Sequence, residues 1–437
     1  MSELQSIAQH AIESAKKYGA QNATATISRK QSLSIKWRKG IIEDIKSAGD
    51  SSLYIELFVD GRYGAFNSSD LRHDSLDDYI HNAIEMARLL EEEPARTLPD
   101  PALYANQSDV DLELYDPEVA KLTPNDLIEK CRTLEAECQK FTDLSIFDIS
   151  TSYNLSLGEL YKINTNGFEG SKQTSNISGS CSITVTDGEK KTAGDAWHSA
   201  RHSADLHKPD AIAGEAAQNC RYHIGATKLD SKKRTIILDR NNTEFLYYFL
   251  RTLDGYSFVD KESYFMDRIG QTIGSPLLDI HDMPFIKRGS GSRLFDSEGI
   301  STKELTLFEH GQLKQIYLDT YCANKLNMKP TSGNMTNVVL TPGKRSCEEI
   351  IADVKDGIYV IGLIGGNSDR SQGDFSYGIF GVAIENGKLT KNVSEMNISG
   401  NFLELWKKLT EVGNDPRDDD DFVMPTLRID DVSTSGS

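Results

Sequence analysis

Three histidines lie close together in the sequence and are the first side chains that could bind a metal ion. His198 and His202 are four residues apart, a spacing that places two imidazoles on one face of a helix, and His207 follows. The helical zinc motif also needs a glutamate directly after the first histidine, where this sequence has Ser199. If residues 193–202 instead form a strand, as the hairpin pattern around them suggests, the first two histidines are about 13 Å apart and cannot share an ion. The sequence therefore argues against a metal site here.

Three further segments could be taken for ligand or nucleophile loops. Residues 290–292 read Ser-Gly-Ser and residues 365–367 read Gly-Gly-Asn, but neither has the glycine spacing that brings backbone N–H groups together on a phosphate. Residues 289–291 also lack the leading glycine of a serine-nucleophile turn. The four consecutive aspartates at 418–421 do not have the alternate spacing of a calcium loop. We therefore expect tight turns and a solvated acidic loop.

The composition excludes several classes of protein. The chain has 437 residues, with 48 Lys and Arg against 66 Asp and Glu, which gives a net charge of −18. This balance argues against direct binding of nucleic acid, because phosphate backbones require a basic surface. No apolar run reaches the roughly 20 residues of a membrane-spanning helix, and the first residues do not form a secretory signal. The six cysteines contain no C-x-x-C pair. We expect a cytoplasmic protein without a membrane contact.

Hydrophobic periodicity predicts the elements of a first domain, residues 1–105. Apolar residues at helical spacing predict helices over residues 4–15 and 76–90. Between them, alternation of apolar and polar residues predicts an antiparallel meander of three strands, at residues 23–35, 41–46 and 52–59. Gly49-Asp50 is the expected turn between the last two of these strands.

Two further segments complete the predicted organisation. Residues 106–230 contain two expected helices, at 124–138 and 211–222, and β-hairpins between 145 and 187. Residues 231–437 begin with a buried strand and a helix, turn a hairpin at Asn386-Gly387, and end with a helix expected over 401–412. The fold class is therefore α+β, with an N-terminal α/β unit that contains an antiparallel meander and a larger, mostly antiparallel β C-terminal domain with helices.

An ordered set of short motifs runs through the last segment. Its members are Lys261-Glu262-Ser263-Tyr264, Gly289-Ser290-Gly291-Ser292-Arg293-Leu294-Phe295-Asp296-Ser297-Glu298-Gly299, Gly311-Gln312-Leu313, Thr331-Ser332-Gly333-Asn334, Gly373-Asp374-Phe375-Ser376, Glu385-Asn386-Gly387-Lys388 and Ile398-Ser399-Gly400-Asn401. This set resembles the TldD/PmbA family, also called the modulator of DNA gyrase family of peptidases. The stretch from Trp197 to His202 agrees with it, so the resemblance covers most of the chain.

The resemblance implies one of two paralogous subunits of a metallopeptidase. In that family the TldD-type subunit carries His-Glu-x-x-x-His on the helix after a buried strand, and the TldE/PmbA-type subunit does not. When the helix is aligned on Gly255, the three motif positions hold Leu246, Tyr247 and Arg251. Leucine offers no lone pair, and arginine carries only donors and a permanent positive charge. The resemblance therefore implies a TldE/PmbA-type chain with no catalytic or metal-binding residue of its own.

The family resemblance also implies partners and substrates. A TldD-type subunit would bring the zinc, which activates water and polarises the scissile carbonyl. This chain would be a catalytically incomplete subunit that walls a chamber for flexible peptides, which strand addition can hold. The implied substrates are leader peptides of modified peptides and labile small proteins. The expected assembly is a heterodimer with the zinc subunit, and like subunits would pair when that partner is absent.

Eight residues in the motifs are candidates for the wall of the chamber or for the interface between subunits. Four are charged, three are glycines and one is an asparagine: Arg293, Asp296, Glu298, Gly333, Asn334, Gly365, Gly366 and Asp374. For the three charged side chains before residue 300, a local ion-pair network that fixes a turn is the structural alternative.

Two other functions stay open at this point. The chain could be a non-enzymatic interaction protein that binds gyrase or another protein or peptide, which capture of that partner without a TldD-type chain would favour. It could also be a metal-independent hydrolase that uses groups such as Asp374 or Ser376, which activity of the isolated chain in the presence of a chelator would favour.

Overall fold

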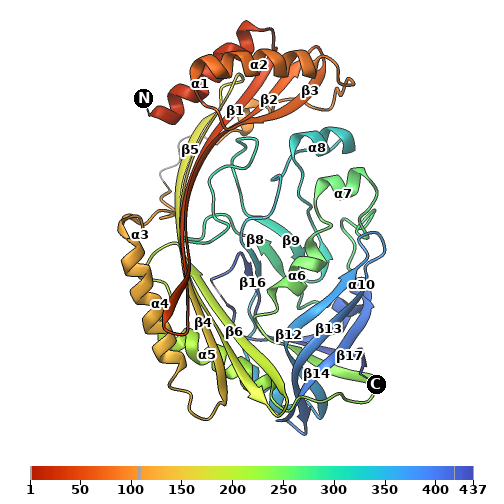
Figure 1. The fold of residues 1–437 in the computed structure, drawn as a ribbon. Helices are drawn as coiled ribbons and strands as arrows, with labels where there is room; N and C mark the ends of the chain where they lie inside the picture. The colour runs from red at the N-terminus through yellow and green to blue at the C-terminus, as the bar shows by residue number, and fades with distance from the viewer. Residues whose placement is uncertain (1, 106–109, 418, 437) are drawn as a thin grey trace.

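A long curved sheet wraps around a β-rich C-terminal half in the computed structural model, which describes residues 2–105, 110–417 and 419–436 (Figure 1). The sheet has six antiparallel strands in the order β3-β2-β1-β4-β5-β6. Their bounds are β1 (Asn22–Arg38), β2 (Ile41–Val59), β3 (Arg62–Ser68), β4 (Ile146–Asn164), β5 (Glu169–Asp187) and β6 (Lys190–Ala200). Because β1 pairs with β4, the sheet continues across the predicted boundary near residue 105.

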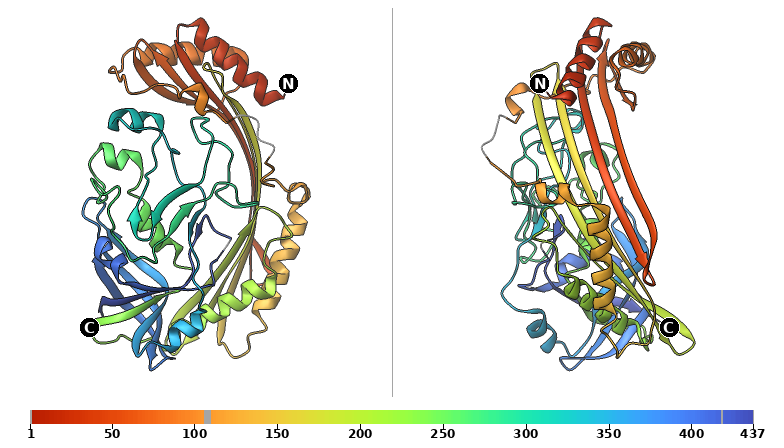
Figure 2. Two further views of the ribbon diagram at one scale, coloured as in Figure 1. Left: turned by 180° about the vertical axis from the view of Figure 1, so that it is seen from behind. Right: turned by 60° about the vertical axis from the view of Figure 1, so that its left-hand side comes forward.

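Helices cover the outer, convex face of this sheet (Figure 2). They are α1 (Glu3–Lys17), α2 (His73–Ala87), α3 (Pro117–Lys121), α4 (Pro124–Cys138) and α5 (Pro209–His223). Odd-numbered strand residues such as Ile27 and Tyr161 pack with α1 and α2, while Ile149 and Ile183 pack with α4 and α5. Since side chains alternate between the faces of a strand, the even-numbered residues beside them point to the concave face. That face is turned toward the C-terminal half (Figure 1).

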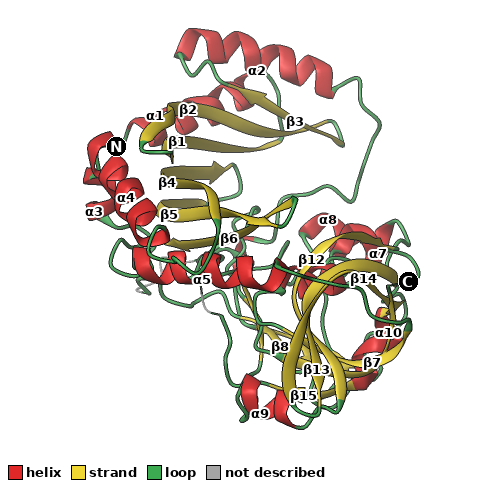
Figure 3. Ribbon diagram, turned by 60° about the horizontal axis from the view of Figure 1, so that its bottom comes forward, coloured by secondary structure: helices red, strands yellow, loops and turns green. Residues whose placement is uncertain are grey.

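The C-terminal half contains a closed barrel, which Figure 3 shows nearly end on. Its strands are β7 (Lys232–Leu238), β12 (Asp356–Ser368), β13 (Asp374–Glu385), β14 (Lys388–Asn401), β15 (Leu409–Val412) and β17 (Leu427–Ser435). The order is β14-β13-β12-β7-β17-β15, and the end of β17 also pairs with β14. This second pairing closes the barrel, so the sheet has few free edges. β7 and β12 are parallel, whereas the other pairs in the barrel are antiparallel.

A second, five-stranded sheet lies beside the barrel. It consists of β8 (Ile280–Asp282), β9 (Leu305–Glu309), β10 (Gln312–Leu313), β11 (Val338–Leu340) and β16 (Phe422–Val423). Short helices surround both sheets: α6 (Thr243–Leu250), α7 (Gly255–Val259), α8 (Thr320–Leu326), α9 (Cys347–Ala352), α10 (Phe402–Leu405), and the 3₁₀ turns η1 (Pro101–Leu103) and η2 (Trp406–Lys408). The common core holds Phe249 of α6 against Trp406, with ring centroids 4.8 Å apart.

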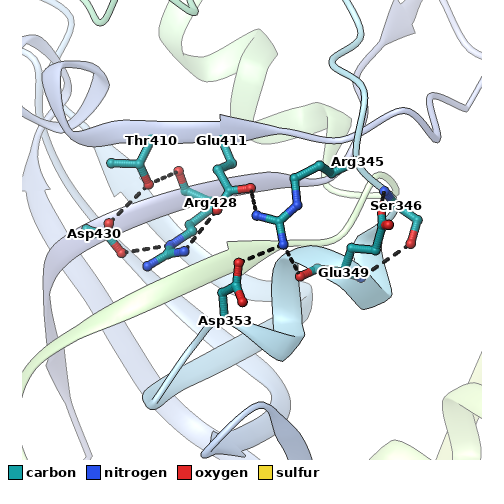
Figure 4. A network of polar contacts seen from close by, with 8 residues as sticks. All are labelled: Arg345, Ser346, Glu349, Asp353, Thr410, Glu411, Arg428 and Asp430. Carbon is teal, nitrogen blue, oxygen red and sulfur yellow. Dashed lines mark hydrogen bonds and ion pairs between the residues drawn. The ribbon is translucent and has the colours of Figure 1, made fainter.

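Hydrogen bonds and ion pairs between charged side chains connect α9 to the barrel (Figure 4). Arg345 precedes α9 and contacts Asp353 and Glu411, and Glu411 of β15 also accepts a hydrogen bond of 2.9 Å from Arg428 of β17. Arg428 in turn donates to Asp430, at 3.2 Å. Each guanidinium in this network therefore has a carboxylate partner.

The predicted fold class is confirmed. The four helices predicted before residue 224 are present as α1, α2, α4 and α5, and the predicted turn at Asn386-Gly387 is present, with positive φ at both residues. The expected turn at Gly49-Asp50 is wrong, because Gly49 pairs with Gln31 inside the ladder between β1 and β2. The final helix predicted over 401–412 is also wrong beyond its first turns. Its last residues instead form β15, since pairing with β17 outweighs local helical spacing. In the described parts of the chain, no helix is long and apolar enough to cross a membrane.

Candidate functional site

A cavity of about 490 Å³ separates the concave face of the long sheet from the loops of the C-terminal half. We call it the central cavity. Its lining residues are Thr26, Tyr54, Glu56, Tyr63, Arg96, Leu160, Lys162, Lys172, Tyr256, Arg293, Phe295, Asp296, Ser297, Glu298, Asp319 and Asn334. Several of them are exposed, including Lys172, Tyr256 and Asn334, so solvent reaches the cavity. Four of the candidates predicted from the sequence line this cavity together with residues from the other half of the chain: Arg293, Asp296, Glu298 and Asn334.

The register of the long sheet determines which side chains form the first wall. Thr26 of β1 lies opposite Tyr54 of β2 on one side and Lys162 of β4 on the other. Leu160 lies opposite Lys172 of β5. Directly opposed residues, and residues two apart in one strand, share a face, so all five side chains point into the cavity. The two lysines are diagonal neighbours on this wall.

The opposite wall is a turn that Asp296 holds in place. One carboxylate oxygen of Asp296 accepts hydrogen bonds from the backbone N–H groups of Glu298 and Ile300, at 2.9 and 3.0 Å, and the other accepts from the N–H of Gly333 at 3.3 Å. Gly299 has φ +89°, and a Cβ there would lie 2.6 Å from the ring of Phe168. The turn therefore requires glycine at this position and lies directly against the long sheet. Asp296 thus fixes a turn, as the structural alternative expected, but through backbone donors: the described residues show no ion pair among Arg293, Asp296 and Glu298.

Arg96 joins the two walls through aromatic rings. Its guanidinium lies 3.7 Å from the ring centroid of Tyr321 and 4.8 Å from that of Tyr63, and it donates a hydrogen bond of 2.9 Å to the hydroxyl of Tyr256. Cation–π contacts of this kind are worth about 0.5–2 kcal/mol each. Tyr63 belongs to the long sheet, while the other two rings belong to the C-terminal half. Arg96 thus helps to hold the two halves of the cavity at a fixed spacing.

Burial shifts the pKa values of several charged groups in the cavity, among them Glu298 and Lys162. Burial raises the pKa of Glu298 to about 7, although the backbone N–H and the hydroxyl of Thr320 both donate to its carboxylate at 2.8 Å. Burial also lowers the pKa of Lys162, whose ammonium donates to the carbonyl of Ser297. Lys162 is only 5% exposed. Such shifted groups in a cavity are typical of functional sites, though ion-pair networks also produce them.

We predict that Glu298→Gln stabilises the chain at pH 8 but not at pH 5. The pKa of Glu298 is about 7 when folded, above its ordinary value of 4.5, so protonation favours the folded state below pH 4.5 and this contribution is lost as the pH rises through 7. At pH 8 the wild type buries a charge that glutamine lacks, and the amide oxygen can still accept from Thr320. We expect a gain of up to about 3 kcal/mol in unfolding free energy, measured by urea denaturation.

The exposed Glu304→Gln serves as the control for this prediction. Because its side chain stays in water in both states, its effect should not differ between pH 5 and pH 8. A Glu298→Gln variant that is equally stable to the wild type at pH 8, or less stable, would contradict the burial of a charged carboxylate at this position.

The three side chains that the family resemblance places at the zinc motif lie on and after α6. Leu246 is fully buried in the core. Tyr247 is 43% exposed and its ring packs on Phe422. Arg251 donates hydrogen bonds of 3.0 and 2.9 Å to the carbonyl and hydroxyl of Ser368. A hydrocarbon, a phenol and a guanidinium do not fit a zinc ion. Across the described residues, no group of three or more His, Cys, Asp or Glu side chains is arranged to hold a metal ion.

The structure distributes the remaining candidates over other places. Gly333 lies beside the central cavity, and its backbone N–H donates a hydrogen bond to the carboxylate of Asp296. Gly365 and Gly366 line a separate hollow of about 670 Å³ on the barrel, formed by β12, β13 and β14. Asp374 begins β13 and accepts a hydrogen bond of 2.8 Å from Asn401. The eight candidates therefore do not form one site.

Of the three histidines considered for a metal site, His198 and His207 are stacked, with ring centroids 3.5 Å apart, while His202 lies apart from them. His198 lies on β6, as the strand interpretation expected, and its Nε2 is 3.2 Å from the carboxylate of Asp419. His202 follows the strand and contacts the carbonyl of Glu113 instead. Within the predicted acidic loop, Asp418 is outside the described residues, while Asp419 pairs with Arg417.

Sequence reasoning missed most of the residues that line the central cavity, including Glu56, Arg96, Lys162 and Lys172. A signal for the lysines was available, since they flank the Asn166-Gly167 turn inside the region of predicted β-hairpins, at distances that place them on one face of the hairpin. The burial of Lys162 and the approach of both lysines to the loop of Arg293 were not visible, because both depend on how the two halves of the chain pack.

Comparison with known proteins shows which protein family has this architecture. Profiles of the PmbA/TldA metallopeptidase domain 1, central domain and C-terminal domain match residues 23–87, 117–220 and 231–436. A solved structure from Bacteroides thetaiotaomicron, described as a candidate modulator of DNA gyrase, is 34% identical over the whole of both chains, with a TM-score of 0.95. The chain belongs to the PmbA/TldD family. It therefore has the fold of this group of metallopeptidases.

Two other members of the PmbA/TldD family extend the comparison. The Escherichia coli O157:H7 protein named metalloprotease PmbA is 27% identical over 397 residues, which cover 90% of this chain and 87% of that protein. TldE from Thermococcus kodakarensis shares the fold, with a TM-score of 0.87 and 20% identity over 98% of this chain and all of that one. In this chain, the sheet wall of the central cavity comes from the first two matched regions, and the opposite wall comes from the third.

Proposed function

We propose that this chain is the non-zinc, TldE/PmbA-type subunit of a heteromeric metallopeptidase that acts on flexible peptides in the cytoplasm. A TldD-type subunit would supply the zinc ion and the water that it activates. The present chain would contribute a wall of the substrate chamber and would be catalytically incomplete by itself. The observation that carries the proposal is the chemistry of α6, whose motif positions hold Leu246, Tyr247 and Arg251.

The packing of α6 supports this proposal independently of the alignment. Phe245, Leu246, Phe249 and Leu250 are fully buried, so more than one face of this short helix lies in hydrocarbon. Metal ligands need a polar surrounding that orients them and exchanges protons with water. The helix therefore has a structural role here, and its conversion into a metal site would require changes in several packed side chains.

A free strand edge supports the presence of a partner chain. β3 pairs only with residues 53–59 of β2, and no described strand pairs with the outer edge of residues 41–52. Ile41, Ile42 and Ile45 on this segment are 67%, 41% and 48% exposed. Open edges with exposed apolar residues favour the addition of another strand. A TldD-type subunit is the proposed occupant, and a second copy of this chain is the proposed occupant in its absence.

Coexpression tests the proposal. The chain is produced with a homologous chain that has an intact His-Glu-x-x-x-His motif, and the two are purified through a tag on the present chain. We expect a complex with one zinc ion per heterodimer and hydrolysis of unstructured peptides by the complex only. The isolated chain should bind no stoichiometric zinc and cleave none of these peptides. Stoichiometric zinc with robust peptidase activity in the isolated chain would reject the proposal.

A non-enzymatic function is the second candidate. It is favoured by one observation, the description of the similar Bacteroides thetaiotaomicron protein as a candidate modulator of DNA gyrase. The same tagged chain can be used to capture partners from a lysate of cells without a TldD-type gene. Specific capture of gyrase under these conditions would favour this alternative over the peptidase subunit.

A further inference from the structure

Among the described residues, four cationic side chains in or beside the central cavity have no ion-pair partner, whereas the charge of Arg96 is held by aromatic side chains. Lys162 and Lys172 on the long sheet and Arg293 on the opposite wall line the cavity, and Arg201, just after β6, lies outside this lining but close enough to repel Lys172. Among the described residues, no carboxylate oxygen lies within 4.0 Å of any of these four cations. Arg345 and Arg428 of the barrel, by contrast, both have carboxylate partners. We call these four residues the basic cluster.

Lys172 occupies the centre of the basic cluster. It lies on the boundary between the central cavity and an adjoining cavity of about 290 Å³, and Arg293 and Phe295 line both as well. Desolvation in this hollow, followed by repulsion from Arg293, Arg201 and Lys162, lowers the pKa of Lys172. Its side chain is nevertheless accessible to solvent. A ligand can therefore reach this ammonium group, and an anion would relieve the repulsion around it.

The acidic side chains of the cavity are committed to other donors. Asp296 accepts from three backbone N–H groups, and Glu298 accepts from Thr320. Asp319 caps α8 through the N–H of Cys322, at 2.7 Å. Glu56 accepts a hydrogen bond of 2.8 Å from the hydroxyl of Tyr63. Glu56, Asp296 and Glu298 contribute to the field at Lys162, but none of the four described carboxylates forms an ion pair with the basic cluster.

The two arginines of the cluster retain unused donors. Arg293 binds the carbonyl and side-chain oxygens of Asn334 through one terminal nitrogen, while its Nε is buried with no hydrogen-bond partner. Arg201 likewise binds two backbone carbonyls and leaves its Nε without a partner. In a chain with 66 acidic and 48 basic side chains, internal carboxylates were available to neutralise these groups. Unpaired cations under these conditions indicate a site for an external anion.

We propose that the basic cluster binds carboxylates of an acidic peptide segment in the central and adjoining cavities. The choice of a peptide rests on the proposed function, whereas the preference for an anion rests on the cluster itself. Cavities of about 490 and 290 Å³ between a sheet and loops suit a short extended segment. Nucleic acid is disfavoured because a net charge of −18 repels a long polyanion outside the hollow. The site thus selects glutamate- or aspartate-containing segments among flexible peptides.

Fluorescence anisotropy on the isolated full chain tests this proposal. The probe is a fluorescein-labelled, unstructured peptide rich in glutamate, compared with a peptide of equal length in which glutamine replaces each glutamate. We expect tighter binding of the acidic peptide, and weaker binding as the salt concentration rises. Lys172→Gln should weaken binding of the acidic peptide about tenfold while leaving the glutamine peptide unaffected.

Lys391→Gln is the matched control, because it removes one exposed positive charge from β14 of the barrel. It should leave the affinity for the acidic peptide unchanged. Equal binding of the two peptides, binding of neither, or an equal effect of Lys391→Gln would overturn the proposal. So would stronger competition by a single-stranded oligonucleotide or inorganic phosphate than by the unlabelled acidic peptide. Because the assay needs no zinc subunit, its outcome is read separately from the coexpression test of the proposed function.

Discussion

Leu246→His is expected to lower the unfolding free energy of the chain by about 3–5 kcal/mol. Leu246 is fully buried on α6, among Phe245, Phe249 and Leu250. Substitution removes buried hydrocarbon and introduces two ring nitrogens into a core that offers them no partner. Both changes act in the same direction, because lost apolar burial and an unsatisfied polar group each destabilise the folded state. Urea denaturation at pH 8, where the imidazole is neutral in water, measures the difference.

Leu246→Met is the control, because it keeps the volume and apolar character of the side chain and should change the stability by less than about 1.5 kcal/mol. The triple variant Leu246→His, Tyr247→Glu, Arg251→His places the three residues of the zinc motif at these positions. We expect it to gain no stoichiometric zinc in the folded chain, since the first position points into the core. A folded triple variant that binds one zinc ion and is stabilised by it would show that α6 is preadapted to bind metal, contrary to our interpretation of its packing.

Elements with a strong local pattern could be predicted from the sequence. The apolar stripe of α1 and the Thr123 start of α4 were visible because both follow from neighbouring residues: Thr123 and Asp126 form a reciprocal capping box. The hairpin at Asn386-Gly387 was visible because both residues tolerate positive φ, which a two-residue turn of this type requires. In each case the information lies within a few residues of the element.

Elements determined by distant pairing could not be predicted in the same way. Gly49-Asp50 has the composition of a turn, yet it stays extended because β1 continues beside it as a pairing partner. Leu409–Val412 continues an apolar helical pattern, but it becomes β15 because β17, some 18 residues later in the ladder, offers a strand edge. Local preferences of a few tenths of a kcal/mol per residue are easily outweighed by such tertiary contacts.

The candidate site was predicted in part for the same reason. The turn from Arg293 to Glu298 was identified through its motif, and the structure places it on the wall of the central cavity. Lys162 and Lys172, which face this turn, belong to a hairpin more than 120 residues earlier and carry no motif. Whether a strand lysine points into water or into a cavity depends on what covers that face of the sheet. Only the packing of the two halves of the chain determines this.

Asp282→Ala is expected to destabilise the chain by about 3–5 kcal/mol. Asp282 is 1% exposed and lies at the end of β8 in the five-stranded sheet. Its carboxylate accepts hydrogen bonds from the hydroxyl of Tyr317 at 2.6 Å and from the N–H of Thr336 at 2.8 Å, and the hydroxyl of Thr336 donates as well. Alanine would leave all three donors without an acceptor in a space that is too enclosed to hydrate them easily. Thermal and urea unfolding measure the loss.

A double-mutant cycle separates the hydrogen bonds of Asp282 from the volume of its side chain. Tyr317→Phe removes one donor and keeps the ring, so the combined Asp282→Ala, Tyr317→Phe variant should be less unstable than the sum of the single variants, by about 1–2 kcal/mol. Thr410→Ser on the exposed side of β15 should show no such coupling to Asp282→Ala. Strict additivity of Asp282→Ala and Tyr317→Phe would contradict the contact. Burial lowers the pKa of Arg293 on the cavity wall and the charge of Asp282 opposes this shift, so the buried network of the five-stranded sheet acts electrostatically on one member of the basic cluster.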